Sequence, residues 1–318
     1  MWYNILLTDF RRFFERNLLM HIFMYSLAHS HGNFDFLDVL LDAVLDTVKM
    51  LPFLFLAFLL MEFIEHRAGD KLAEALGRAG KKTAVGPAAG ALLGCVPQCG
   101  FSVAAANLYA GRVITLGTLI SVFIATSDEA IPVLLAHPDM FGSIWKLIAV
   151  KIAAALVAGI AADIIIKAFK IRTDGESIED ICTESGCGCG SHGIWYSALK
   201  HTVGVGIFIL IVNLIIGTVM SFAGSEAVAH FIGGMGIFQP FAAGLVGMIP
   251  NCAASVLITE LYAEGAISFG TAAAGLCTGA GIGLAVLFRS NKNIKENLVI
   301  TGIVYAAGAA CGIIINLF

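Results

Sequence analysis

The chain has 318 residues, of which 58% are hydrophobic and only 13% are charged, and its formal net charge is −4. Soluble globular proteins carry about 25% charged residues, so the composition excludes an ordinary soluble domain and indicates an integral membrane protein. The small negative charge and the lack of a basic tract in the sequence argue against nucleic-acid binding. We therefore expect an all-α, polytopic membrane protein surrounded by lipid, with no nucleic acid among its partners.

Residues 1–35 mix arginines with large apolar side chains, among them Arg11, Arg12 and Phe13. This mixture is typical of an amphipathic helix that lies in the membrane interface. A short additional membrane segment is the alternative. We treat residues 1–35 as an N-terminal extension that precedes the membrane repeats.

Ten apolar segments follow in two sets of five. The first set, within residues 36–168, comprises 38–65, 84–96, 98–111, 113–136 and 143–168. The second set, within residues 197–318, comprises 197–223, 228–248, 250–263, 266–288 and 297–318. A polar linker, residues 169–196, joins the two sets. Several segments are shorter than the ~20 residues that a helical span needs, so we expect hairpin arms that meet inside the membrane.

The two sets are related by an internal repeat. The stretch Gly94–Val103 returns as Gly247–Val256 at an offset of 153, and 11 of the 25 residues from 94 to 118 are identical at that offset. Because each set has five segments, an odd number, the second set should enter the membrane from the opposite side. The sequence thus predicts two inverted repeats, each with a proline-broken helix or hairpin at the midplane, as in many secondary transporters.

The loops show which side faces the cytoplasm. Lysine and arginine concentrate in residues 66–83, 167–172 and 289–295, which all lie on one side of a ten-segment protein. The excess of positive charge marks that side as cytoplasmic. The linker 169–196 should therefore be cytoplasmic.

Two matched triplets interrupt the repeats and are the first candidate site. A proline in each removes an amide donor and breaks the helix, so freed carbonyls can meet a polar substrate. Each proline is followed by an amide side chain and a thiol. The alternative is that the proline only kinks the helix while the amide caps it. The candidate substrate-binding residues are Pro97, Gln98, Cys99, Pro250, Asn251 and Cys252.

A second candidate lies inside the apolar run 113–136, where Thr126 and Ser127 precede Asp128 and Glu129. Adjacent carboxyl groups in a membrane are expensive and mark an ion or proton path. A helix N-cap is the alternative, and both roles are compatible. The repeat partner of Asp128 is Gly281, so the acidic charge belongs to one repeat only. We assign Thr126 and Ser127 to the substrate site and the two acids to ion binding or proton coupling.

Other polar residues within apolar segments have weaker signals. Asp46 and Lys49 are spaced to form an ion pair in the first segment and join the candidates for ion binding or proton coupling. Asn107, Asp163, Asn213 and Glu260 are isolated, and for them we expect helix-to-helix hydrogen bonds. The cysteines in apolar segments, including Cys277 and Cys311, are by default small buried apolar side chains.

The central linker carries Cys182, Cys187, Cys189 and His192 within eleven residues. Thiols and imidazole in a glycine-rich stretch can hold a soft or borderline metal, and cytoplasmic thiols stay reduced. We expect an accessory metal-collecting site there. A flexible polar linker is the alternative.

Four motifs carry a resemblance to a known family. They are the stretches 94–102, 126–132, 246–255 and 278–283. These residues resemble the bacterial ten-helix heavy-metal exporters, a group related to the organoarsenical efflux permeases and often described as manganese or arsenic exporters. The resemblance runs from about Phe36 to the C-terminus, with residues 1–35 outside it. It implies an efflux permease of the bacterial inner (plasma) membrane, crossing it several times, and leaves the ion open.

These features together predict a secondary exporter of a metal or metalloid that works by alternating access and is driven by protons. No nucleotide-binding motif is present in the sequence, and we expect neither an enzyme nor a bound cofactor. Oxygen ligands would suit Mn²⁺, whereas Cys99 and Cys252 would suit a trivalent arsenical. The alternatives are a membrane thiol–disulfide carrier that uses Cys99 and Cys252, and a sensor without transport. Assembly into a homo-oligomer stays open.

Overall fold

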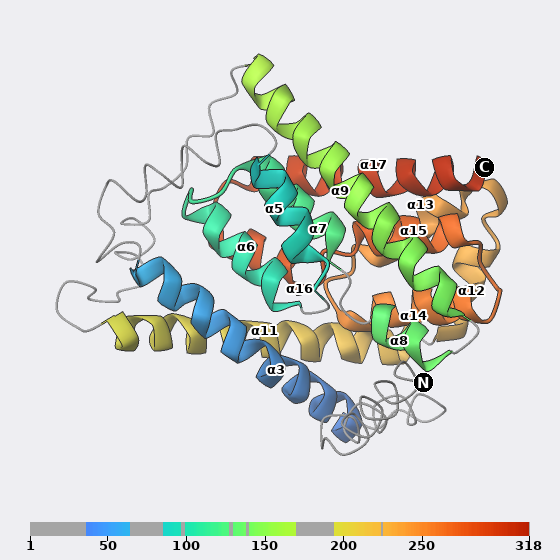
Figure 1. Cartoon of the computed structure of the whole chain (residues 1–318). Helices are drawn as coiled ribbons and strands as arrows, with labels where there is room; N and C mark the ends of the chain where they lie inside the picture. The colour runs from blue at the N-terminus through green and yellow to red at the C-terminus, as the bar shows by residue number, and fades with distance from the viewer. Residues whose placement is uncertain are drawn as a thin grey trace, which may run out of the picture.

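The computed structural model describes residues 36–63, 85–96, 99–126, 130–137, 140–169, 194–223 and 225–317. Every regular element in these ranges is a helix, so the all-α prediction is confirmed for them (Figure 1). The elements are α3 (Phe36–Phe63), α5 (Val85–Gly94), α6 (Gly100–Ala110), α7 (Leu116–Ala125), α8 (Ala130–Ala136), α9 (Phe141–Phe169), α11 (Ile194–Ala223), α12 (Ser225–Gly233), η3 (Gly236–Phe238), α13 (Gln239–Gly247), α14 (Cys252–Ala263), α15 (Phe269–Thr278), α16 (Ile282–Ser290) and α17 (Ile294–Leu317).

Each of the ten apolar segments contains at least one of these helices, in the same order in both sets. Within the described part of the chain, five segments are long and apolar enough to cross a bilayer, and a sixth is a pair bent by 110°. The five are Leu116–Ala136, Phe141–Ile166, Ala198–Met220, Phe269–Ser290 and Ile294–Leu317. The bent pair is Ala227–Gly233 with Gly236–Gly247. The protein is thus a multi-pass helical membrane protein.

Four helices, α5, α6, α13 and α14, have only 9 to 12 residues. At 1.5 Å per residue none of them can cross the ~30 Å hydrocarbon layer by itself. Pro250 lies in the break between α13 and α14, as the sequence places it. In the first set, Pro97 and Gln98 fall between α5 and α6 and are outside the described residues.

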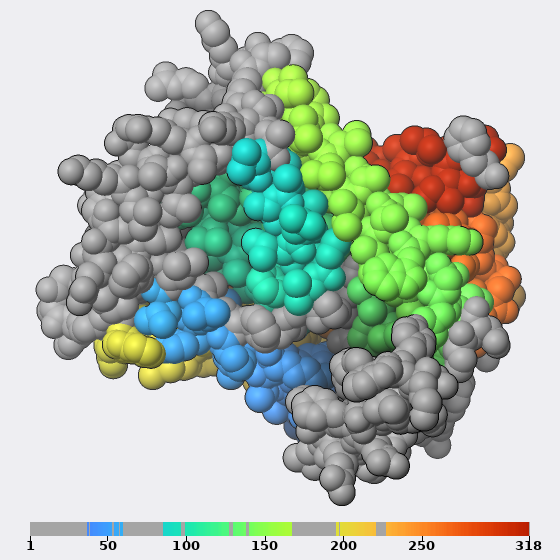
Figure 2. Space-filling model, in the orientation of Figure 1, coloured from blue at the N-terminus to red at the C-terminus, as the bar shows by residue number. Residues whose placement is uncertain are grey.

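The outer helices present apolar side chains. Figure 2 shows α3, α5 and α9 on one outer face, in blue, teal and green. Leu92, Leu93, Trp145 and Val157 on these helices are all exposed. Such a surface suits lipid, which accepts apolar side chains but offers no partner to backbone polar groups.

The packing inside each set repeats at the offset of 153. A Cβ on Gly117 would overlap the carbonyl of Gly159, and a Cβ on Gly270 would overlap that of Gly312. These glycines let α7 approach α9, and α15 approach α17, closely enough for backbone contact. The start of α7 is also bonded to Asp163, which accepts from the Gly117 N–H at 2.8 Å.

Asp163 and its repeat partner, Asn316, make equivalent hydrogen bonds in the two sets. Thr115, the N-cap of α7, donates to Asp163 at 3.0 Å, and Ser268, the N-cap of α15, donates to Asn316 at 2.7 Å. In the first set this bond joins the residue before α7 to the C-terminal part of α9. In the second set it joins the residue before α15 to the C-terminal end of α17. The helix-to-helix hydrogen bond predicted for Asp163 is confirmed.

The two sets also pack on one another. The first helices, α3 and α11, lie against each other, while α6 packs on α16 and α14 packs on α8 (Figure 1). The short helix after each break therefore contacts the other set. The extension 1–35 and the linker 169–196, apart from its ends at Phe169 and Ile194–Tyr196, lie outside the described residues.

Candidate functional site

A small pocket lies where helices of both sets meet. Its lining includes Thr126 and Lys151 from the first set and Asn251, Ser255 and Leu276 from the second. Its volume is about 10 Å³, which is room for about one water molecule. Polar groups from the two sets of helices thus converge on one small site.

Lys151 of α9 is the residue that sequence reasoning missed. It is 1% exposed, and its ammonium donates to the carbonyl oxygens of Thr126 and Leu276, the latter at 2.6 Å. Both carbonyls belong to the C-terminal ends of helices, α7 and α15, where backbone acceptors lack helical partners and the helix dipole is negative. One buried cation therefore joins the broken ends of two helices. The available signal was a lysine in the middle of an apolar run.

Thr126 and Asn251, predicted from the sequence, lie in the same pocket. The Asn251 side chain accepts a hydrogen bond from the Ala253 N–H at 2.7 Å, so it caps α14. This is the capping role that the sequence left as an alternative, and it places the amide at the pocket wall. The Thr126 hydroxyl donates to the Val122 carbonyl at 2.7 Å.

Cys99 and Cys252 occupy matching positions at the N-terminal ends of α6 and α14. They are 7% and 8% exposed. Pro250 directly precedes Asn251 in the break. Their part in substrate binding stays a prediction, as does that of Pro97 and Gln98.

The acidic candidates lie outside the described residues, as does Ser127. Thr126 precedes Ser127, Asp128 and Glu129 in the chain, and Ala130 follows them; both flanking residues line the pocket. Gly281, the repeat partner of Asp128, also lines it and has a positive φ of 54°.

The remaining predicted sites are elsewhere. Lys49 Nζ lies 3.3 Å from Asp46 Oδ1 on α3, and both side chains are partly exposed. This ion pair does not line the pocket. Cys182, Cys187, Cys189 and His192 are outside the described residues, and within the described ones no group of three His, Cys, Asp or Glu side chains could hold a metal.

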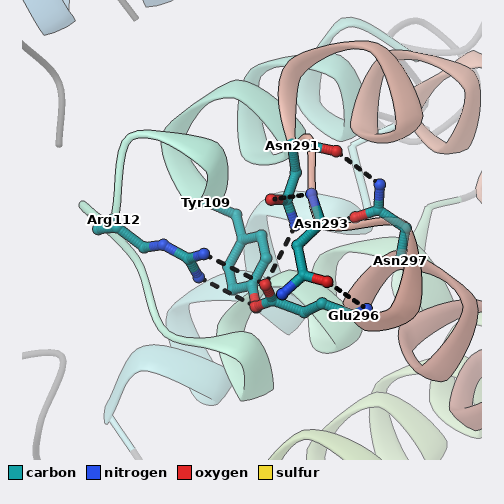
Figure 3. A network of polar contacts seen from close by, with 6 residues as sticks. All are labelled: Tyr109, Arg112, Asn291, Asn293, Glu296 and Asn297. Atoms are coloured by element: carbon teal, nitrogen blue, oxygen red, sulfur yellow. Dashed lines mark hydrogen bonds and ion pairs between the residues drawn. The ribbon is translucent and has the colours of Figure 1, made fainter. Parts of the chain in front are cut away.

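Away from the pocket, two contacts tie the sets together, and each is the counterpart of the other at the offset of 153. We call the first the charged clamp: Tyr109, Arg112 and Glu296 (Figure 3). The Tyr109 hydroxyl donates to the Glu296 carboxylate, and Arg112 donates to it through two nitrogens at 3.0 and 3.2 Å. It joins the end of α6 to the start of α17.

Two asparagines bond to Glu296 (Figure 3). Asn291 donates to its carboxylate at 3.4 Å, and Asn293 accepts from its backbone N–H at 3.3 Å. Burial by itself would lower the pKa of the Arg112 guanidinium, but the bonds to Glu296 outweigh burial and raise that pKa. Arg112 therefore stays charged in the clamp.

We call the counterpart the neutral clamp: Ser143 and Tyr262. Their hydroxyl groups are 2.8 Å apart, joining the end of α14 to the start of α9. Tyr262 corresponds to Tyr109, and Ser143 corresponds to Glu296. The tyrosine contact between the sets is therefore repeated, but the Arg112–Glu296 ion pair has no counterpart at Gly265 and Ser143.

A second pair of counterparts supports the same relation. Ser290 of α16 donates to Asn107 of α6 at 2.8 Å. At the offset of 153, Asn107 corresponds to Glu260 and Ser290 to His137, and His137 lies 3.9 Å from Glu260. The helix-to-helix bond expected of Asn107 is thus confirmed, and Glu260 forms an ion pair whenever His137 is protonated.

The protein is therefore a polytopic helical membrane protein with an internal polar site. The site lies at the junction of the two sets and holds the buried Lys151. A family model described as "Putative, 10TM heavy-metal exporter" matches residues 35–232, more than half of the chain. The chain belongs to this family. Comparison with curated proteins and with solved structures gave no match.

Proposed function

We propose that this protein is a secondary-active efflux permease for a metal or metalloid in the bacterial inner membrane. The observation that carries the proposal is the small polar pocket to which both sets contribute, with Lys151 bonded to the ends of α7 and α15. A site at the interface of two repeated halves is the arrangement that alternating access requires.

Inversion of the two halves is part of the proposal. Counterpart contacts recur at the offset of 153, and each half has five segments. With inverted halves the two clamps lie at opposite membrane faces, and the lysine-rich loop 289–295 puts the charged clamp on the cytoplasmic side. In this conformation both clamps are formed. Export then requires each clamp to open in turn.

Asp128 and Glu129 are proposed to carry the coupling protons. The residues on both sides of Ser127–Glu129 line the pocket, so a proton bound there can exchange with a substrate. Carboxyl groups inside a membrane are kept for such paths because burying them is costly. The cysteines of the linker are proposed to collect substrate on the cytoplasmic side, with only a modest contribution to flux.

The test is metal content and flux in cells and in inside-out vesicles. Cells that express the chain are challenged with Mn²⁺, Zn²⁺, arsenite and methylarsenite, and intracellular elements are measured. We expect one of these elements to fall relative to cells without the protein, and we expect Asp128→Asn to abolish pH-driven flux. Glu264→Gln, an exposed acid after α14, is the matched control.

The outcomes separate the alternatives. A fall in Mn²⁺ that survives Cys99→Ser with Cys252→Ser would indicate a cation exporter with oxygen ligands. A fall in arsenic that needs both thiols would indicate a thiol-based site. No change in any element, together with a Cys99–Cys252 disulfide on oxidation, would reject export and favour the thiol–disulfide carrier.

A further inference from the structure

The ammonium of Lys151 is shared between the two sets of helices. Lys151 belongs to α9 of the first set and is 1% exposed. It donates to the carbonyl oxygen of Thr126 in its own set and, at 2.6 Å, to that of Leu276 in the other set. Charged side chains inside a membrane are costly and mark functional positions. The bond to Leu276 is thus a contact between the sets, made by a costly group.

The two acceptors lie where α7 and α15 end, and we call the carbonyl oxygens of Thr126 and Leu276 the carbonyl pair. Thr126 is the C-cap of α7, and Leu276 is in the last turn of α15. In a continuous helix the Ala280 N–H would bond to the Leu276 carbonyl, but it bonds to the Thr278 carbonyl at 2.9 Å instead. Carbonyls at a C-terminal helix end carry partial negative charge. The carbonyl pair is therefore suited to a cation, and Lys151 supplies it.

The counterpart of Lys151 in the second set is apolar. At the offset of 153, Lys151 corresponds to Val304 of α17, which is 2% exposed and lies in the hydrophobic core. An apolar side chain therefore satisfies the packing at this position. The ammonium is an addition to the repeated framework, made in the first set.

The same contacts fix two walls of the pocket. Lys151 and both residues of the carbonyl pair line it, and so does Gly279, the C-cap of α15. The end of α7 thus forms one wall and the end of α15 another. Each wall is bonded to the same ammonium, so moving that ammonium away would release a wall from each set together.

We propose that Lys151 is a positioning residue of the transport site, and that its ammonium is a built-in cation that holds the ends of α7 and α15 at the pocket. The proposal rests on the export function above and assigns this residue its part in it. The carbonyl pair calls for positive charge and N–H donors in one group. Lys151→Ala should therefore leave a place that a free primary ammonium ion fills. n-Propylammonium corresponds to the part of the side chain that this change removes.

The first experiment measures the protection of the two helix ends in the purified full chain. Amide hydrogen exchange of residues 120–126 and 270–280 is followed in detergent by mass spectrometry. We expect exchange to be at least ~10-fold faster in Lys151→Ala, because hydrogen bonds to a charged group are lost. n-Propylammonium should restore slow exchange. Tetramethylammonium, which has no N–H donor, and 1-propanol, which has no charge, should not restore it.

Lys146→Ala is the matched control, because Lys146 is an exposed lysine of the same helix. Its exchange should equal that of the wild type. Wild-type exchange in Lys151→Ala, or equal restoration by all three solutes, would overturn the proposal. If Lys151→Ala does not elute as a folded protein, Lys151→Met replaces it, since methionine has a similar length and no charge. Wild-type exchange in Lys151→Met would overturn the proposal as well.

The second experiment asks whether this contact serves transport. Flux of Mn²⁺ and methylarsenite into inside-out vesicles is normalised to the amount of folded protein, so that a loss of stability alone leaves it unchanged. We expect Lys151→Met to lower the flux of the exported probe by ~100-fold, because a misplaced site loses its working geometry. Lys146→Met should keep that flux. Amines are left out of this assay, since weak bases collapse a pH gradient.

Failure of this inference is distinguishable from failure of the proposed function. Wild-type flux in Lys151→Met would show that the lysine does not position the transport site, and export would stand. The other result is fast exchange in Lys151→Ala that n-propylammonium reverses, in a protein whose wild type moves neither probe. That result would support the binding of a cation by the carbonyl pair and would count against the export function.

Discussion

The two clamps differ in chemistry although they occupy equivalent places in the two sets. The charged clamp joins Tyr109 to Glu296 and Arg112, whereas in the neutral clamp Tyr262 meets only Ser143. The tyrosine is common to both, so the geometry is inherited from the repeat. Two positions differ: Glu296 corresponds to Ser143, and Arg112 corresponds to Gly265. A repeated framework can therefore hold its two ends with unequal strength.

The backbone at Arg112 shows that the difference has a cost. Its φ is +58°, and the counterpart Gly265 has a φ of +76°. A side chain in this region is disfavoured by about 1–2 kcal/mol, which glycine avoids. The arginine also lies over the Tyr109 ring, with the guanidinium 5.2 Å from its centre. The first set thus tolerates a strained residue to place a cation at the clamp.

The largest effect is expected from Glu296→Ala, which removes the acceptor of both Tyr109 and Arg112. Arg112 then keeps a partly buried charge without its partner, and such losses cost 3–5 kcal/mol when fully buried. Since the two side chains are 21% and 11% exposed, we expect about 2–3 kcal/mol of unfolding free energy. Denaturant unfolding in detergent, with hydrogen exchange of residues 105–115, measures it. A loss no larger than that of Glu264→Ala would contradict the charged clamp.

Arg112 can be changed in two ways that separate charge from strain. Arg112→Ala removes the ion pair and keeps a side chain at positive φ, while Arg112→Gly removes both. The glycine variant should therefore be more stable than the alanine variant by about 1 kcal/mol. The comparison is made by denaturant unfolding of the two proteins side by side. Equal stabilities would mean that the backbone there relaxes without strain.

Loss of the neutral clamp should cost less. Tyr262→Phe and Ser143→Ala each remove one partner of a single hydroxyl–hydroxyl bond, which is worth about 1 kcal/mol. In a double-mutant cycle the two changes should be non-additive, because both remove the same interaction. Additive losses would show that the hydroxyl groups act independently. Tyr305→Phe, whose hydroxyl donates to the Phe241 carbonyl instead, is a control tyrosine.

The smallest effect is expected at His137 and Glu260. Their charged atoms are 3.9 Å apart and the side chains are 41% and 31% exposed, so solvent screens the pair. We expect His137→Ala to change stability by less than about 1 kcal/mol. Denaturant unfolding of the two proteins in detergent checks this. A loss as large as that of Glu296→Ala would place this pair with the charged clamp in strength.

The sequence predicted two residues of the pocket, Thr126 and Asn251, but did not predict Lys151. The repeat and the proline positions predicted breaks, and Thr126 and Asn251 do meet in the pocket. Lys151 escaped because a lone lysine on an apolar helix gives no pattern until its acceptors are placed. Those acceptors are backbone carbonyls of Thr126 and Leu276, and any residue type supplies them.

The contacts between the sets were also beyond the sequence. Tyr109 and Glu296 are 187 residues apart, and Lys151 and Leu276 are 125 residues apart. No local periodicity connects such residues. Once the repeat offset is known, however, the Tyr109 contact predicts the Tyr262 contact, because a repeated backbone places equivalent positions alike.

The amino-acid sequence by itself determined a helical membrane protein with an internal sequence repeat, because composition and a fixed offset can be found without knowing any contact. Only the tertiary structure decided which polar groups meet: Lys151 with two helix ends, and the side chains of the two clamps. Those meetings depend on how closely helices approach, which the glycines at 117, 270 and 312 set through backbone contact.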